Sequence, residues 1–375
     1  MTRRLLFWIS ISFAACIAAK WSALEAGAAP AKGSSEFTIR TEPGHAMAPE
    51  GGTAEFEVVL LDATGHPTAG RLGVKTDAKA SAAEPAGLEI PAAGPGKFRF
   101  TAEGIAPGMH TVEFIHGPSK ASHKLYVDVV DRATWEGFRR AAERVEIKTL
   151  PAHLVFIGDS LTDLFRGQNY VDKVGFWLRQ RHGAQATVRN AGVGGDYILR
   201  VWDRLNHDPK SYRLEMYDDL WQPKPTHVFF FLGHNDSKLS SDSGYTKPVV
   251  EPALFLDTYR RAIGKVQKET GAKVAVISAT SSVYEITQAT AEKSRAKGKA
   301  HNLFGKPEAL EEFNALARRA AAECGTDWID VYELTRRHPE KAGLFTADGV
   351  HINNAGNRLV ALEILKFLAG DQRPQ

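Results

Sequence analysis

Cysteine is almost absent from this chain, which has two, Cys16 and Cys324, among 375 residues. Cys16 lies in an N-terminal segment that we expect to be removed, so that Cys324 would be the one thiol of the mature chain. An internal disulfide is then excluded, and the fold has to be stabilised by its apolar core.

An excess of one charge is also lacking. Lysine and arginine number 47 against 44 aspartates and glutamates, which gives a formal net charge of +3, and no run of basic residues stands out. Nucleic acid is therefore not expected as a partner, because proteins bind it through clustered Lys and Arg. With 43% hydrophobic and 24% charged residues, the chain is typical of a globular protein, long enough for two domains.

The first residues have the pattern of an export signal. Arg3 and Arg4 precede an apolar run, Leu5–Ala19, which is too short and too interrupted by serine to span a membrane comfortably. Because Ala26-Gly27-Ala28 offers a small-x-small cleavage site, we predict a signal peptide over residues 1–28.

The predicted signal peptide implies a secreted or periplasmic protein of bacterial type, with no membrane span in the mature chain. A linker rich in Ala, Gly, Pro and Ser follows over residues 29–35. An alternative is a lipoprotein signal with a lipid anchor on Cys16, although Phe13 stands where such signals usually carry leucine.

Residues 36–131 are predicted to form a small all-β domain. Short runs with alternating apolar and polar residues are separated by Gly, Pro and Asp, a texture typical of an immunoglobulin-like sandwich. The expected strands are Phe37–Thr41, Glu55–Asp62, Lys97–Ala102, His110–Ile115 and His123–Asp131. We interpret this domain as a spacer or docking module, and the alternative is a dedicated carbohydrate-binding role.

A helical connector is expected over residues 132–149, and from residue 150 to 370 strands alternate with amphipathic helices. Such alternation predicts a parallel sheet with helices on both faces, an α/β domain of three layers. The expected strands are His153–Ile157, Thr187–Ala191, Thr226–Leu232, Lys273–Ser278 and Asp327–Val331.

Polar residues follow the first three of these strands directly. Ser160 follows the first, Gly192, Gly194 and Gly195 follow the second, and Asn235 follows the third. Ligands of parallel sheets bind beyond the carboxyl ends of the strands, so these residues are expected to share one edge of the sheet.

A serine hydroxyl becomes a nucleophile when a base removes its proton and a third group orients that base. Asp348 and His351 lie three residues apart in the segment FTADGVHINNAG, Phe345–Gly356. One loop could thus supply both the base and its orienting carboxylate for Ser160. Backbone N–H groups of Gly195 and Ser160, together with the Asn235 amide, could stabilise an oxyanion.

Four segments resemble, in order, the conserved blocks of the SGNH hydrolases, the GDSL esterase/lipase family: FIGDSLTD, NAGVGGD, FLGHND and DGVH. The resemblance covers the α/β region and not the β domain. It implies a flavodoxin-like α/β/α fold and a serine esterase without a cofactor or catalytic metal. It also implies that Ser160 is the nucleophile, His351 the base and Asp348 its orienting residue.

The same resemblance makes Ser160, Gly195 and Asn235 the oxyanion donors. Because NAGVGGD holds three glycines, Gly194 remains an alternative to Gly195. We expect Asp159 to serve mainly as a turn former at the start of the first helix.

The substrate is predicted to be an O-acetyl group on a polysaccharide or other glycan. Export, the sandwich domain and the aromatic residues Tyr197, Trp202 and Trp221 favour a glycan, because sugar faces stack on aromatic rings. A lipase or thioesterase of the same family is one alternative, and a catalytically silent glycan-binding or adhesion protein is another. A metallophosphoesterase is disfavoured, because GHND reverses the His and Asn order that such enzymes use.

Overall fold

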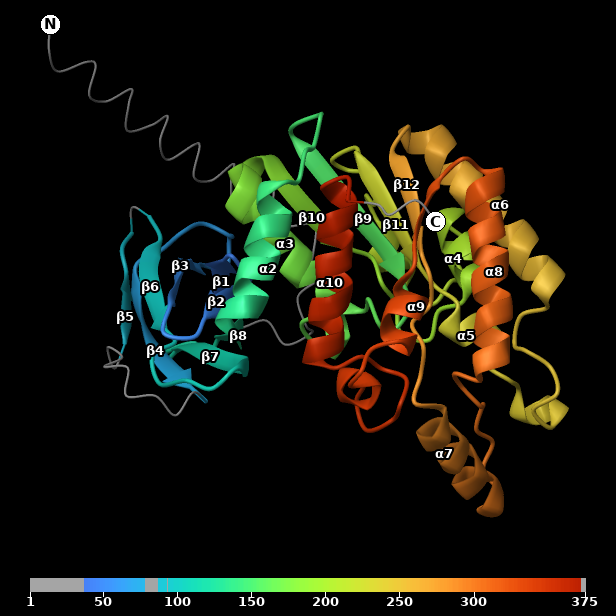
Figure 1. Cartoon of the computed structure of the whole chain (residues 1–375). Helices are drawn as coiled ribbons and strands as arrows, with labels where there is room; N and C mark the ends of the chain where they lie inside the picture. The colour runs from blue at the N-terminus through green and yellow to red at the C-terminus, as the bar shows by residue number, and fades with distance from the viewer. Residues whose placement is uncertain (1–36, 78–86, 93, 372–375) are drawn as a thin grey trace, which may run out of the picture. The chain divides into compact units, whose positions relative to one another are not determined.

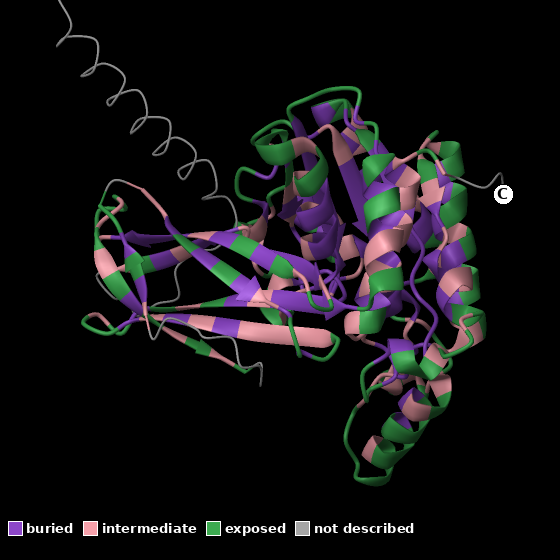
Figure 2. Cartoon of the chain, turned by 60° about the vertical axis from the view of Figure 1, so that its left-hand side comes forward, coloured by how far each residue is buried: buried purple, intermediate pink, exposed green. Residues whose placement is uncertain are grey.

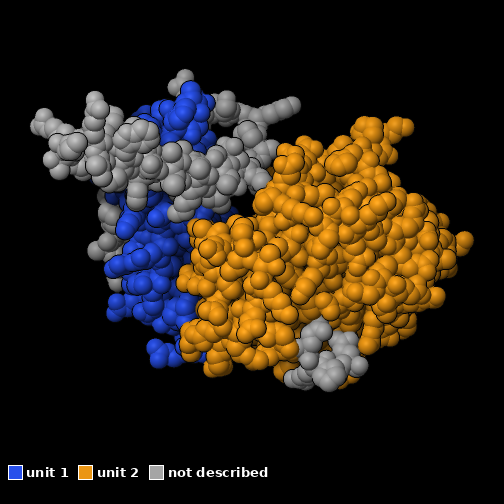
Figure 3. Space-filling view, turned by 90° about the horizontal axis from the view of Figure 1, so that it is seen from above, with its two compact units in different colours: residues 1–137 blue, residues 138–375 orange. Residues whose placement is uncertain are grey.

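The computed structural model describes residues 37–77, 87–92 and 94–371. The predicted signal peptide, the linker, the cleavage site and Cys16 lie outside these residues. The chain divides into two compact units, residues 1–137 and 138–375, which Figure 3 colours separately.

Two β-sheets make up the first unit (Figure 1). Three strands form one sheet in the order β1 (Thr38–Glu42), β3 (Thr53–Leu61) and β6 (Gly96–Thr101). Five strands form the other, in the order β2 (His45–Pro49), β8 (Ser122–Val130), β7 (Gly108–His116), β4 (Gly70–Thr76) and β5 (Leu88–Ile90).

The two sheets of the first unit pack face to face. Phe98 of β6 and Phe114 of β7 meet edge to face with ring centroids 5.2 Å apart, and both side chains are buried. The alternating pattern of these strands therefore supplies the core between two layers. The all-β character predicted for this region is confirmed, whereas the immunoglobulin-like assignment and the domain boundaries stay predictions.

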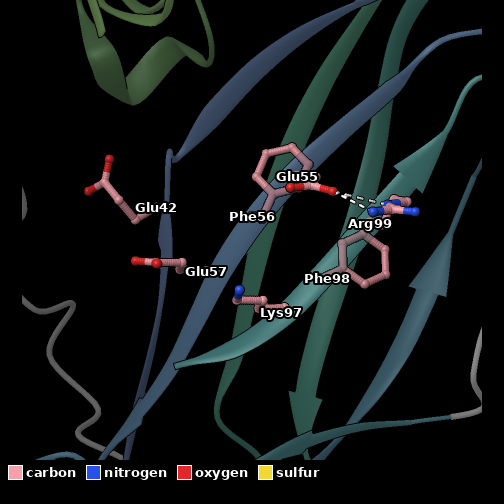
Figure 4. Close-up of a pocket in the computed structure, with 7 residues that line it drawn as sticks. All are labelled: Glu42, Glu55, Phe56, Glu57, Lys97, Phe98 and Arg99. Carbon is pink, nitrogen blue, oxygen red and sulfur yellow. Dashed lines mark hydrogen bonds and ion pairs between the residues drawn. The ribbon is translucent and has the colours of Figure 1, made fainter. Parts of the chain in front are cut away.

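A hollow on the three-stranded sheet of this unit is lined by acidic, basic and aromatic residues (Figure 4). Its volume is about 530 Å³. The Glu55 carboxylate accepts hydrogen bonds from the Arg99 guanidinium there, at 2.6 and 3.1 Å. The lining residues are Glu42, Glu55, Phe56, Glu57, Lys97, Phe98 and Arg99, and none of them belongs to the predicted catalytic set.

The boundary between the two units falls within helix α2 (Arg132–Glu143), and a five-stranded parallel sheet forms the centre of the second unit. Its order is β10 (Ala186–Asn190), β9 (Ala152–Gly158), β11 (His227–Phe231), β12 (Lys273–Ile277) and β13 (Asp327–Ile329). Numbered along the chain this order is 2-1-3-4-5, the flavodoxin-like order, so the predicted fold class is confirmed.

Helices cover both faces of this sheet (Figure 1). One layer contains α3 (Tyr170–His182) and α10 (Asn354–Leu368), and the other contains α4 (Ile198–Leu205), α6 (Pro252–Thr270) and α8 (Pro307–Glu323). Shorter elements complete the unit: α5 (His234–Ser237), α7 (Tyr284–Ala296), α9 (Val331–Arg336) and the 3₁₀ turns η2 (Leu164–Arg166), η3 (Gly183–Gln185), η4 (Leu214–Tyr217), η5 (Ser241–Ser243) and η6 (Lys341–Leu344).

The central strands β9, β11 and β12 are mostly apolar because both of their faces are covered. In β9, Val155 and Ile157 face the α4, α6 and α8 layer, whereas Phe156 stacks on Phe229 of β11 and meets Tyr170 of α3 edge to face. Figure 2 shows the strands buried and α7 largely exposed where it extends away from the sheet. The sheet is thus a rigid support whose carboxyl edge carries the polar residues.

Candidate active site

Ser160 lies in a tight turn directly after β9, and its side chain is partly exposed. Asp159 shapes this turn, because its carbonyl accepts the N–H groups of Thr162 and Asp163 at 3.0 and 2.9 Å. A β-carbon on Gly158 would lie 2.9 Å from the Phe231 carbonyl oxygen and closer still to Thr162. The buried strand and the glycine before the turn together hold the serine in a fixed position.

The three residues predicted as a triad meet in the structure. His351 Nε2 lies 2.9 Å from Ser160 Oγ, and His351 Nδ1 lies 2.5 Å from Asp348 Oδ2. Asp348 Oδ1 accepts the Val350 and His351 N–H groups at 2.9 Å each, and the Thr346 hydroxyl at the same distance. Hydrogen bonds within this loop therefore hold the Asp348 carboxylate against the His351 imidazole.

Asp348 is held in its charged form. Partial burial acts to raise its pKa, but hydrogen bonds from the Val350 N–H and from the His351 ring and N–H outweigh burial and lower the pKa to about 2. A carboxylate facing Nδ1 requires the proton to reside on Nδ1, so Nε2 is left to accept the hydrogen of the Ser160 hydroxyl.

The glycine segment after β10 lies beside the serine. The Gly194 N–H is already engaged, since it donates to Asp163 Oδ2 at 2.8 Å. Gly195 adopts φ +82°, a conformation that favours glycine, and its N–H has no hydrogen bond to any residue that the structure describes. Gly195, and not Gly194, is thus the residue with a donor to spare.

Asn235 is the second residue of α5, just after β11, and it is 4% exposed. Its Nδ2 donates to Asp159 Oδ2 at 3.3 Å, and its Oδ1 accepts from Lys238 Nζ at 3.1 Å. One of the two amide hydrogens remains for another acceptor. β9 and β11 flank the point where the strand order reverses, so Ser160 and Asn235 lie where such sheets bind ligands.

A sequence profile of the GDSL-like Lipase/Acylhydrolase family matches residues 156–359, more than half of the chain. The chain belongs to this family. It is accordingly a carboxylic-ester hydrolase. The match begins within β9 and ends within α10, so it contains every residue of the candidate site.

Solved structures similar to this family member include a lipase/acylhydrolase from Enterococcus faecalis, with 22% identity, coverage of 60% of this chain and 98% of the other, and a TM-score of 0.41. An acetyl xylan esterase from Geobacillus stearothermophilus has 19% identity, coverage of 60% and 97%, and a TM-score of 0.39. The esterase EstA from Pseudoalteromonas has 14% identity, coverage of 58% and 94%, and a TM-score of 0.37. No curated protein matches the chain.

Sequence reasoning missed two supporting residues of this GDSL-family site. Asp159 forms the expected turn bond, from the Leu161 N–H to Oδ1 at 2.9 Å, but its other oxygen braces Asn235. Lys238 contacts the opposite end of the same amide. Neither contact has a sequence pattern, although the close spacing of Lys238 after Asn235 on a short helix made contact possible.

Burial shifts the pKa values of the acids and of the histidine that lie beside the oxyanion donors. Burial raises the pKa of Asp159 to about 7, against the opposing hydrogen bond from the Leu161 N–H. His234 is buried and contacts the Thr280 hydroxyl at 2.9 Å, and burial lowers its pKa to about 3. His234 is therefore neutral and serves as a packing residue beside the site.

The aromatic residues expected near the site separate in the structure. Tyr197 is two residues from Gly195, but Trp221 precedes β11, at the amino edge of the sheet, where its Nε1 donates to Glu269 at 3.2 Å. Trp202 lies under the Arg261 guanidinium of α6. Trp221 is therefore at the opposite edge of the sheet from Ser160, too far away to stack on a sugar at the site.

Among the residues that the structure describes, no group of three or more His, Cys, Asp or Glu side chains could hold a metal ion. Nor does any helix in those ranges have the length and hydropathy needed to cross a membrane.

Proposed function

We propose that this enzyme is an exported serine esterase that removes O-acetyl groups from a glycan through an acyl-enzyme. The observation that carries the chemistry is the continuous contact from Asp348 through His351 to Ser160, at 2.5 and 2.9 Å, beside the uncommitted Gly195 N–H. A nucleophile, a base, an orienting carboxylate and an oxyanion donor are then within reach of one ester carbonyl.

The proposed reaction proceeds in two halves. Ser160 Oγ attacks the ester carbonyl carbon while His351 Nε2 takes its proton, and the oxyanion is stabilised by the N–H groups of Ser160 and Gly195 and by the Asn235 amide. The tetrahedral intermediate collapses, and the alcohol leaves with the proton from His351. Water, deprotonated by His351, then attacks the acyl-enzyme and releases acetate.

The polar character of the site supports a small acyl group on a polar alcohol. The side chains that form hydrogen bonds around Ser160 include Asp163, Asn235, Lys238 and His351, which are polar or charged. A long acyl chain needs an apolar channel. The predicted signal peptide supports an extracellular polymer as substrate.

The test is acetate release by the mature protein from a panel of acetylated glycans, with nitrophenyl esters of increasing chain length alongside. We expect acetate release from at least one glycan and much faster cleavage of nitrophenyl acetate than of the octanoate. Ser160→Ala serves as the control for contaminating esterases. The reverse chain-length preference would favour the lipase or thioesterase alternative, and a folded protein without activity on any ester would favour the silent binding protein.

Export is tested separately. We propose cleavage after Ala28, so the intact mass of protein recovered from the periplasm or medium is expected to begin at Ala29. Recovery in the membrane fraction with an acylated Cys16 would instead support the lipoprotein alternative.

A further inference from the structure

Two cations stand beside the candidate oxyanion donors. Arg200 is exposed, its guanidinium lies 4.8 Å from the centroid of the Tyr197 ring, and a β-carbon built on Gly195 would lie 3.9 Å from its Nη1. Lys238 Nζ lies 3.1 Å from Asn235 Oδ1. Arg200 thus lies beside Gly195, and Lys238 lies beside Asn235, the two proposed oxyanion donors outside the serine turn.

The two cations also influence each other. Burial lowers the pKa of Lys238, and the positive charge of Arg200 lowers it further. Lys238 is partly buried, with its ammonium 5.0 Å from the centroid of the Phe304 ring. The two positive charges therefore act on one small volume.

Neighbouring arginines have carboxylate partners. Arg204 forms a fully buried bidentate pair with Asp196, at 2.6 and 2.8 Å, and Arg213 pairs with Asp163 at 3.1 Å. Over the described ranges, neither Arg200 nor Lys238 forms an ion pair. Two positive charges are therefore left to face whatever occupies the site.

The nearby acids compensate these charges only in part. Burial raises the pKa of Asp159 and of Asp236 to about 7 each, so near neutral pH each acid carries only part of a negative charge. Both side chains are also enclosed in the protein, with 1% and 0% exposed. An anion arriving from solvent would meet the cations and not these acids.

The position of Arg200 opposes the preference of its own helix. It is in the first turn of α4, and this turn contains no acidic residue. The positive end of the helix dipole disfavours a cation at this position. A guanidinium kept in an unfavourable place, held over an aromatic ring and without a partner, indicates a role toward a ligand.

We propose that Arg200 and Lys238 form an anion subsite that binds a carboxylate on the alcohol part of the substrate, which makes the substrate an O-acetylated glycan containing uronate residues. The ester of such a sugar carries a negative charge close to the carbonyl under attack. Formation of the oxyanion adds a second negative charge, and two cations next to neutral donors offset the repulsion. This inference rests on the proposed catalytic role of Ser160.

A glycan fits the site better than an anionic phospholipid. Both carry groups that a guanidinium binds through paired hydrogen bonds. A phospholipid, however, also requires apolar surface for its acyl chains, whereas the two cationic groups contact the side chains of Tyr197, Phe304 and Asn235.

The test compares two small esters that differ in charge, 3-acetoxybenzoate and its methyl ester. At low ionic strength we expect kcat/KM of the wild-type enzyme to be about tenfold higher for the anion. In about 1 M salt, where the screening length is roughly 3 Å, this ratio should approach one. Arg200→Gln should reduce the ratio about tenfold, and Lys238→Met should reduce it as well.

Arg261→Gln is the matched control. Arg261 also lies over an aromatic ring, at 4.2 Å from the Trp202 centroid, but it contacts Asp257 and lies on α6, outside the site. Arg261→Gln should leave the ratio of kcat/KM for the anion to kcat/KM for the methyl ester unchanged. A ratio of one in the wild-type enzyme, or equal effects of Arg200→Gln and Arg261→Gln on it, would overturn the proposal of an anion subsite.

Polymers then identify the source of the carboxylate. Acetate release should be faster from an acetylated polyuronate than from an acetylated xylan of equal acetyl content, and Arg200→Gln should narrow this difference. Faster hydrolysis of anionic phospholipid vesicles than of either polymer would overturn the glycan assignment. If Ser160→Ala retains activity, the proposed function itself fails; if it is inactive and the charge ratio is one, only the subsite fails.

Discussion

Asn235 Nδ2 donates a hydrogen bond to Asp159 Oδ2 at 3.3 Å, which connects the residue after β11 to the residue before Ser160. Two neighbouring strand ends are tied together by side chains, each buried. This bond orients the Asn235 amide, whose other Nδ2 hydrogen we propose to donate to the oxyanion.

Asp159 is therefore predicted to act as a positioning residue through Asn235. Asp159→Ala should lower kcat about tenfold with little change in KM, because the amide would be aimed less well. The double variant Asp159→Ala/Asn235→Ala should be no slower than Asn235→Ala alone, since coupled residues are not additive. Steady-state kinetics on nitrophenyl acetate measure both effects, and additive losses would leave Asp159 with a purely structural role.

Asn235→Ala tests the oxyanion assignment directly. An amide donor that is aimed at a charge formed only in the transition state typically contributes about 10²–10³ in kcat. We expect a loss on this scale with KM nearly constant, in a protein whose circular dichroism and melting temperature match the wild type. Near-normal kcat would mean that Asn235 only braces its loop.

Ser160 is predicted to be the one residue labelled by a serine-directed organophosphonate, because His351 Nε2 lies 2.9 Å from its hydroxyl. Peptide mass spectrometry should locate a single adduct on the peptide containing Ser160. His351→Ala should react far more slowly, since no base removes the proton. An adduct on another serine would contradict the assignment.

Asp348→Asn should lower kcat by about 10–10³, less than His351→Ala, because the loop still holds the imidazole through the backbone. The pKa of Asp348 is lowered to about 2, so its carboxylate stays charged as the pH falls from neutral through its ordinary value of 3.8. The acid limb of the wild-type pH–kcat profile should therefore lie well above pH 2, because Asp348 is still charged there. An acid limb near pH 2 would show that protonation of Asp348 limits kcat.

Asp236 should make the protein less stable as the pH rises. Burial raises its pKa from 3.8 to about 7, so between these values the unfolded chain releases a proton that the folded chain retains. The free energy of unfolding should fall across this interval, by at most about 1.4 kcal/mol per pH unit for one such group. Asp236→Asn keeps an oxygen for the Ile198 N–H and should flatten the dependence in urea titrations; an unchanged slope would contradict this.

The sheet of the second unit could be predicted because its strands are buried on both faces. Continuous apolar runs such as the one at residues 154–157 have few other interpretations, and the structure places β9 at Ala152–Gly158. The strands missed in the first unit, β2, β4 and β5, are short or contain Pro or Gly. Their pairing with neighbours, and not their own pattern, makes them strands.

The candidate site could be predicted only in part. Asp348 and His351 lie in one loop, so their contact follows from spacing, and Ser160 is marked by its place after a strand. The contact of Asn235 with Asp159 depends on how β9 and β11 lie side by side, which no local pattern encodes. Nor did any local pattern indicate that Asp163 accepts a hydrogen bond from the Gly194 N–H.

The loop that carries His351 is attached to the segment that leads into α7, a helix that is itself largely exposed. The Val283 N–H donates to the Gly349 carbonyl at 2.8 Å, and a β-carbon on Gly349 would lie 2.7 Å from the Val283 carbonyl oxygen. The segment before α7 therefore shares a backbone contact with Gly349, which lies between Asp348 and His351. Shortening this segment, or cutting α7 with a protease, would loosen the general base without altering any residue of the triad.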